Sequence, residues 1–285
     1  MQLYTLIEQA ELPASIDVVM NLQKSIASQS DSVRDFANKM KTEPVLTAKL
    51  LRVANSAFYG AQTITTVEEA IMMIGTDDLT HLILACEVMS SFEGMDYRVS
   101  LELFWRQNIY CAAAAYHLSK AAKRNRSTLF TCGLLRGIGS LILYRYLPAK
   151  CQQVMDIIQS KPEVPPYLLE QMEYGFHHAD VASALLQHWG LPESLFNSIR
   201  HYVNPSRADS DHMIDSSVIN VAYRATAEKF NLPFVVERNW LKNMTQISDD
   251  ELLEDIQFDI QKHYEKAVVA LLNTDVDKPK LVVSH

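Results

Sequence analysis

The sequence is poor in glycine and proline. Its 285 residues include only 8 Gly and 10 Pro, while leucine, alanine and other residues that favour helices are abundant. Hydrophobic residues make up 48% of the chain, enough to bury a substantial core and to exclude a disordered protein. We therefore expect an all-α fold with short loops rather than a sandwich or a barrel.

Cysteine is also scarce, and it follows no recognisable spacing. The chain has four cysteines in separate apolar segments and no C-x-x-C pair. This arrangement suits buried, reduced thiols of the cytosol better than a disulfide framework or a zinc knuckle. These residues are Cys86, Cys111, Cys132 and Cys151.

Excess positive charge and long uncharged apolar runs are missing as well. The net charge of -8 opposes adsorption to DNA or to an anionic membrane. The basic run Lys120–Arg126 is expected to be a solvated helix end. No uncharged stretch reaches the ~18 residues that a membrane-spanning helix needs, and the N-terminal residues lack the pattern of a signal peptide. We expect a soluble cytoplasmic protein with neither nucleic acid nor membrane as its partner.

Helix signals follow one another along the chain and suggest three regions. Residues 1–95 are expected to form an N-terminal helical lobe, 96–205 a second lobe, and 206–285 a C-terminal helical extension packed on the second lobe. Thr66–Glu69 has the pattern of a capping box, and Gly75 that of a C-terminal cap. Helices are also expected over about 76–91, 101–120, 128–146, 148–159, 167–174, 179–188, 192–202, 213–230 and 248–272.

An ordered series of motifs resembles the HDOD family, the HD-related output domains of bacterial signalling proteins. The resemblance runs from about Leu12 to Val203. It implies a two-lobed helical bundle whose second lobe is like HD-type phosphohydrolases, and a role as a signalling module that acts on other proteins. The segments that carry it are Glu43–Gly60, Ile64–Gly75, Phe104–Arg106, Gly133–Leu135 with Ile138-Gly139, and Phe176–Pro192.

The resemblance also implies that the primary metal site of the HD enzymes is lost. Their first His ligand falls at Gln107, their His-Asp pair at Arg136-Gly137, and their late Asp at Tyr223. A guanidinium has five donors and no acceptor, so Arg136 cannot ligate a metal. Without a metal to lower the pKa of bound water, no nucleophile for phosphoester hydrolysis is evident.

The resemblance also implies part of a second metal site. His178 and His201 match additional histidines of multi-metal HD enzymes, although Tyr202 stands where another His would be expected. His177 and His178 precede an apolar helix, so capping or packing is the simpler expectation for them. Two imidazoles alone would make a weak, open site for a residual divalent metal.

Two further features admit more than one interpretation. Arg136 is expected to pair with an acidic neighbour, and the alternative is that it binds an anion together with His177, His178 and His201. The polar and aromatic segment that contains Asn55, Ser56, Phe58 and Tyr59 is either an interaction surface or a tight turn.

Three functional hypotheses follow. The first is a non-catalytic signalling or regulatory protein that needs no cofactor and acts through other signalling proteins. The second is a metal-dependent phosphohydrolase whose site has moved to His177, His178 and His201 with Asp180 or Glu173. The third is a pocket that senses a nucleotide or phosphate. A phosphohydrolase name for such a chain would follow from its scaffold rather than from its site.

Overall fold

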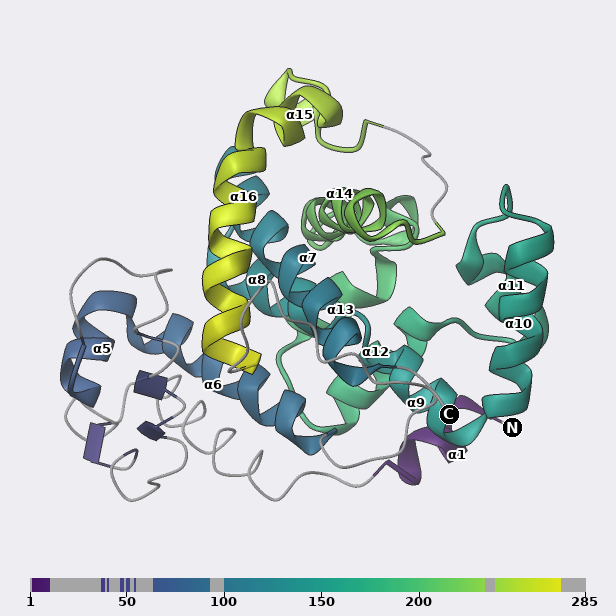
Figure 1. Ribbon diagram of the computed structural model, residues 1–285, viewed down its shortest axis with the longest axis horizontal. Coiled ribbons are helices and arrows are strands. Elements are labelled where there is room, and N and C mark those ends of the chain that lie inside the picture. The colour runs from purple at the N-terminus through teal and green to yellow at the C-terminus, as the bar shows by residue number, and fades with distance from the viewer. Residues whose placement is uncertain are drawn as a thin grey trace. The chain divides into compact units, whose positions relative to one another are not determined.

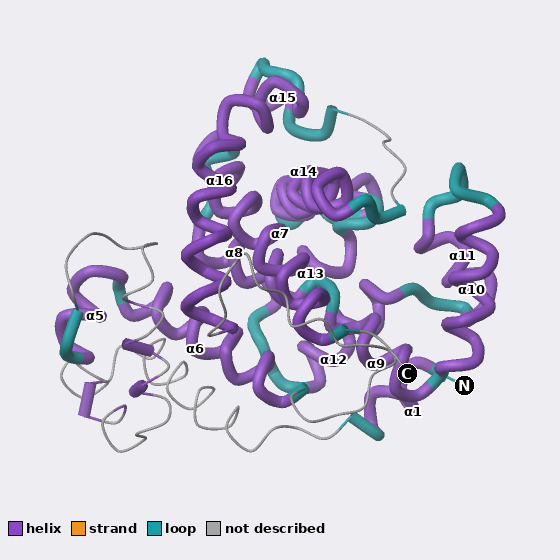
Figure 2. Tube along the Cα trace, in the orientation of Figure 1, coloured by secondary structure: helices purple, strands orange, loops and turns teal. Residues whose placement is uncertain are grey.

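The computed structural model describes residues 2–10, 64–92, 100–233 and 239–272, together with a few single positions between 37 and 54. Every regular element in these residues is a helix (Figures 1 and 2). The expected all-α class is confirmed. The segment with Asn55, Ser56, Phe58 and Tyr59 lies outside the described residues, so its proposed role as an interaction surface stays a prediction.

The chain divides into two compact units. One comprises Met1–Glu11 and Asp96–Ile260, and the other comprises Leu12–Met95 and Gln261–His285. The long helix α16, Asp249–Leu272, contributes residues to both units. All candidate site residues from Gln107 onward belong to the unit that contains Asp96–Ile260.

In the other unit, the predicted helix signals near residue 70 are confirmed. Helix α5, Val67–Ile74, begins with a capping box: the Glu69 amide donates to the Thr66 hydroxyl at 3.2 Å, and the Thr66 amide donates to the Glu69 carboxylate at 3.1 Å. Gly75 then adopts a φ of +87°, a left-handed value that favours glycine, and separates α5 from α6, Thr76–Ser91.

The first unit is built around α7, Leu101–Ala121, which packs against α8, Arg126–Leu135, and α14, Met213–Phe230. Small residues allow these helices to approach closely. The run of four alanines from Ala112 is fully buried in α7, and a Cβ atom at Gly133 of α8 would lie 2.7 Å from the Ala112 Cα. The helix contact therefore depends on residues with little or no side chain.

The chain bends at Arg136-Gly137, where a single helix over 128–146 was expected. That prediction is wrong: α8 ends at Leu135, and α9, Ile138–Tyr146, begins after a turn. Glycine is a poor helix former, and the bend lets α8 pack against α7 while α9 packs against α12, His178–His188.

The stretch Arg126–Tyr146 has the length and apolarity of a membrane span, but 83% of its most apolar window is buried inside the protein.

Gly139 brings α9 directly onto the start of α12. A Cβ atom there would collide with the His178 carbonyl oxygen and lie 2.7 Å from the Ala182 amide nitrogen. The backbone at His178 is therefore fixed by a contact that only glycine permits. The remaining elements are α1 (Leu3–Glu8), α10 (Pro148–Ser160), α11 (Pro166–Tyr174), α13 (Glu193–His201), η1 (Pro205–Arg207) and α15 (Lys242–Thr245).

Helices α10 and α11 form a hairpin at one edge of Figure 1. Its small core consists of Val154, Ile158 and Leu169. Gly175 ends α11 in a left-handed conformation, with φ +84°, and directs the chain toward α12. The loop from Gly175 to His178 therefore joins the hairpin to the helix that carries the candidate histidines.

Candidate functional site

His177 caps helix α12. Its Nδ1 accepts a hydrogen bond from the Asp180 amide at 3.2 Å, and its own amide donates to the Asp180 carboxylate at 3.2 Å. Burial lowers the pKa of His177 to about 4, although the Asp180 charge opposes this shift. The ring is thus neutral at pH 7, as an accepting Nδ1 requires. Capping was the simpler sequence interpretation of His177, and it is confirmed.

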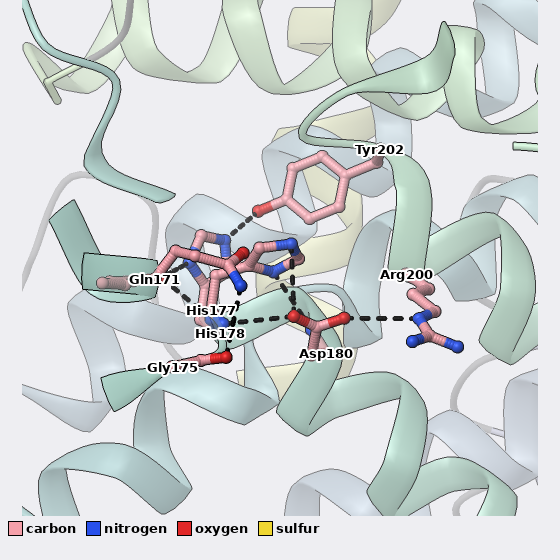
Figure 3. Close-up of polar contacts among 8 residues, drawn as sticks. Gln171, Gly175, His177, His178, Asp180, Arg200 and Tyr202 are labelled. Atoms are coloured by element: carbon pink, nitrogen blue, oxygen red, sulfur yellow. Dashed lines mark hydrogen bonds and ion pairs between the residues drawn. The ribbon is translucent and has the colours of Figure 1, made fainter. Parts of the chain in front are cut away.

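His178 is held at both ring nitrogens (Figure 3). Its Nδ1 lies 2.6 Å from the Glu170 carboxylate, and its Nε2 lies 2.7 Å from the Tyr202 hydroxyl. The network assigns the tautomer: Nδ1–H donates to Glu170, and Nε2 accepts from Tyr202. The Glu170 carboxylate also accepts the His178 amide at 2.8 Å. Neither ring nitrogen of His178 has a free lone pair for a metal.

Arg136 lies at the other end of this chain of contacts. Its Nη1 donates to the Tyr202 hydroxyl at 3.4 Å, and its guanidinium carbon lies 4.1 Å from the centre of the Tyr223 ring and 5.8 Å from that of Tyr202. Arg136 is 6% exposed. Its expected pairing with an acidic neighbour does not occur: within the described part of the chain, no carboxylate lies at ion-pair distance from it. Aromatic faces hold the cation instead.

Glu170, His178, Tyr202 and Arg136 thus form one connected set, which we call the relay. It has a carboxylate at one end and a guanidinium at the other, with an imidazole and a phenol between them. Burial raises the pKa of Tyr202 despite the opposing charge of Arg136, so its hydroxyl stays protonated and donates to His178. Among the described residues, the buried Arg136 Nε has no hydrogen-bond partner, so the relay is satisfied at its other contacts but not at this atom. Hydrogen-bonded networks in a core favour a single packing arrangement.

The other positions that the resemblance matches to HD-type metal ligands carry a tyrosine, a glycine and a glutamine. Tyr223 stacks edge-on against Tyr202, with ring centres 5.7 Å apart. Gly137 packs against α7, where a Cβ atom would lie 2.7 Å from the Asn108 side-chain oxygen and 3.1 Å from a ring carbon of Phe104. A carboxylate at position 137 would need that packing to shift. Gln107 is half-buried on α7.

The site residues that the structure describes do not fit a divalent metal ion. Within the described ranges, no group of three or more His, Cys, Asp or Glu side chains could hold one. Of the carboxylates considered as partners for a moved site, Asp180 is bound to His177 and to Arg200, and Glu173 lies 3.4 Å from Lys150. No reaction step through a metal is therefore derived from this arrangement.

A cleft of about 600 Å³ opens beside the relay. His177 and His201 line this cleft, whereas His178 and Arg136 do not. Burial, and then the Arg200 charge, lower the pKa of His201. The four residues that the sequence grouped as one residual pocket are thus divided between a closed relay and an open cleft.

Sequence reasoning missed the carboxylate that orients His178 and the cations of the cleft. Glu170 lies eight residues before His178, on a helix that ends before the capping loop, so helical spacing gives no signal for the pair. Arg200 and Arg207 sit near helix ends, where cations are ordinarily solvated. The aromatic residue Tyr202, noted only as a poor replacement for a histidine, is the centre of the relay.

The chain is similar in sequence to a bacterial protein. An uncharacterized protein of Treponema pallidum is 26% identical over 208 residues, which is 71% of this chain and 39% of the relative. The chain therefore spans well under half the length of that relative.

Three solved structures share the fold. A structure named "putative phosphohydrolase" from Shewanella amazonensis has a TM-score of 0.73 and 22% identity, covering 94% of this chain and 97% of the other. An HDOD domain protein of Geobacter sulfurreducens has a TM-score of 0.74 and 18% identity, with the same coverage. A structure named "putative signal transduction protein" from Marinobacter aquaeolei has a TM-score of 0.73 and 19% identity, covering 96% of this chain and 62% of the other.

These likenesses establish the fold, and the family assignment rests on the sequence itself. The HDOD domain family matches residues 12–205, more than half of the chain. The motifs singled out in the sequence, from Glu43–Gly60 to Phe176–Pro192, all lie within that range. The chain belongs to the HDOD domain family.

Proposed function

We propose that this chain is a non-catalytic signalling or regulatory protein of the cytoplasm that acts by binding other signalling proteins. The observation that carries the proposal is the relay. Where HD-type enzymes hold a metal, this chain places the Arg136 guanidinium against two tyrosine rings. The names of two structural neighbours refer to phosphohydrolases and to signal transduction. The residues of this chain favour the second role.

The chemistry explains this preference. Hydrolysis of a phosphoester at an HD-type site needs a metal that generates hydroxide near neutral pH and neutralises charge on the phosphoryl oxygens. Arg136 supplies a positive charge but cannot activate water, because it has no acceptor and stays protonated. His178 is occupied at both nitrogens, and His177 is neutral and committed to capping α12. No general base and nucleophile converge in the described residues.

A hydrolase screen tests the proposal. The purified chain is incubated with phosphomonoester and phosphodiester substrates in the presence of Mn²⁺, Fe²⁺, Ni²⁺ or Zn²⁺. The matched control is the double variant His178→Ala/His201→Ala, with its folding checked by circular dichroism. We expect the same background rate for both proteins. Turnover by the native chain that disappears in the double variant would reject the proposal and support a metal-dependent phosphohydrolase with a moved site.

A further inference from the structure

The cleft beside α12 has a positive local charge in an acidic protein. Its lining includes two guanidinium groups, Arg200 and Arg207, and one carboxylate, Asp180. Arg200 and Arg207 both act electrostatically on His201, so the two charges lie within reach of the same part of the cleft. The chain as a whole carries a net charge of -8. The local charge of this cleft is therefore opposite in sign to the net charge of the chain.

Asp180 cancels only part of this charge. One of its carboxylate oxygens lies 3.3 Å from the Arg200 Nε, and the other accepts the His177 amide at 3.2 Å (Figure 3). Only the Nε of Arg200 is occupied by this contact. Within the described ranges, its two terminal nitrogens make no hydrogen bond, and the Arg207 side chain makes neither a hydrogen bond nor an ion pair. Two guanidinium groups therefore have donors available for a ligand.

Guanidinium groups with free donors suit phosphate. Each presents a flat fork of N–H groups that matches two oxygens of a phosphate. Asp180 holds Arg200 by its Nε and so limits its side-chain freedom, which lowers the entropy lost on binding a ligand. A carboxylate ligand would use the same forks, but it would satisfy fewer donors than a phosphate with three terminal oxygens.

Aromatic side chains form another part of the cleft. Tyr167, Tyr174 and Phe176 all line it. Tyr167 is half-buried and contacts the His177 ring edge-on, with ring centres 5.8 Å apart. Aromatic rings offer stacking surfaces for any flat, unsaturated ring system. Gln171 adds a side-chain oxygen, because its amide nitrogen donates to the Gly175 carbonyl at 3.2 Å.

We propose that this cleft binds a nucleotide. Arg200 and Arg207 would bind its phosphate, and the aromatic side chains that line the cleft would contact its base. The volume of about 600 Å³ falls within the range of ordinary small-molecule sites. The proposal differs from the sequence-based expectation of a nucleotide pocket, which assigned the phosphate to Arg136. It goes beyond the regulatory role and does not depend on it, because a bound nucleotide could serve either as a signal or as a substrate.

Calorimetric titration of the full chain tests this proposal. The probes are adenosine 5′-monophosphate, guanosine 5′-monophosphate, the two matching nucleosides and inorganic phosphate. We expect at least one nucleotide to bind more tightly than its nucleoside and than phosphate. Arg200→Gln and Arg207→Gln should each weaken nucleotide binding by about tenfold, because each removes a charge-assisted hydrogen bond. Tyr167→Leu should weaken nucleotide binding but leave phosphate binding unchanged.

The matched control is Arg145→Gln, which removes an exposed arginine of α9 that does not line the cleft. It should bind as the native chain does. Nucleotide binding that survives both Arg200→Gln and Arg207→Gln, or no binding by any probe at millimolar concentration, would overturn the proposal. Hydrolysis of a nucleotide that depends on these arginines would support the cleft and contradict the non-catalytic role, so the two proposals fail separately.

Discussion

Arg136 and Arg200 carry the same guanidinium group in opposite surroundings. Arg136 is 6% exposed and is held by tyrosine rings and a phenol oxygen, whereas the Arg200 side chain is 54% exposed and keeps two terminal nitrogens free of protein contacts within the described residues. The comparison teaches that the guanidinium of Arg136 belongs to the core. The cations that remain available to a ligand lie in the neighbouring cleft, outside the positions that the family resemblance identifies.

The largest expected effect concerns the glycine that fixes the relay. Gly139→Ala places a methyl group against the backbone of His178 and Ala182, so we expect the free energy of unfolding to fall by roughly 3 kcal/mol. Gly175→Ala, at the wall of the cleft, strains a left-handed φ but meets no atom within 4 Å, and should cost about 1 kcal/mol. Urea denaturation measures both. Equal losses would show that the relay is no more tightly packed than the cleft.

Removing the buried cation should have the next largest effect. Arg136→Met removes the cation from the tyrosine rings and leaves the Tyr202 oxygen without its donor, so we expect the free energy of unfolding to fall by about 2 to 3 kcal/mol. Arg136→Lys keeps the charge but not the flat contact with the tyrosine rings and should fall between Met and the native residue. Chemical denaturation distinguishes the three proteins. A Met variant as stable as the native chain would contradict the role of Arg136 in the relay.

The free energy of unfolding should depend on pH through the capping residue His177. His177 has a pKa of about 4 in the folded chain, below its unfolded value near 6.5. The unfolded state therefore binds a proton first as the pH falls, and stability is lost between pH 6.5 and 4. At pH 5 this amounts to about 2 kcal/mol. His177→Asn keeps a capping side chain and should remove this part of the pH dependence, measured by denaturation at pH 7 and pH 5. If the variant loses as much stability between pH 7 and pH 5 as the native chain, a group other than His177 causes the loss.

The smallest expected effect on stability comes from replacing the two arginines of the cleft. Arg200→Gln and Arg207→Gln remove exposed cations, so we expect each to change the free energy of unfolding by less than about 0.5 kcal/mol. Thermal and urea denaturation of both variants beside Arg136→Met provide the check. A loss as large as that of Arg136→Met would mean that the cleft arginines hold the fold together and are poor candidates for ligand binding.

Much of the fold could be predicted from local signals. The capping box at Thr66–Glu69, the break at Gly75 and the extent of α14 follow from residue preferences within a few positions. The bend at Arg136-Gly137 was missed, although glycine is a poor helix former, because the apolar pattern on both sides runs on without interruption. The packing that accompanies the bend is tertiary: α8 packs against α7, and α9 packs against α12.

The site could be predicted only in part. The place of His177 before an apolar helix predicted its cap. The ligand positions that the resemblance implies stay a prediction. The contact between His178 and Glu170 joins two helices, so no spacing rule reveals it. The expected acidic partner of Arg136 was wrong for a related reason: the rings of Tyr202 and Tyr223, from distant parts of the chain, face its guanidinium instead.

The central proposal is that this HDOD chain acts without a metal and carries the buried Arg136 cation at a position that the resemblance matches to a metal ligand of the HD enzymes. Equilibrium dialysis of the native chain against Mn²⁺, Fe²⁺, Ni²⁺ and Zn²⁺ in turn, followed by elemental analysis, tests it most directly. The account predicts far less than one metal ion per chain, with no difference between the native protein and His178→Ala/His201→Ala. One metal ion per native chain that is lost in the double variant would contradict it.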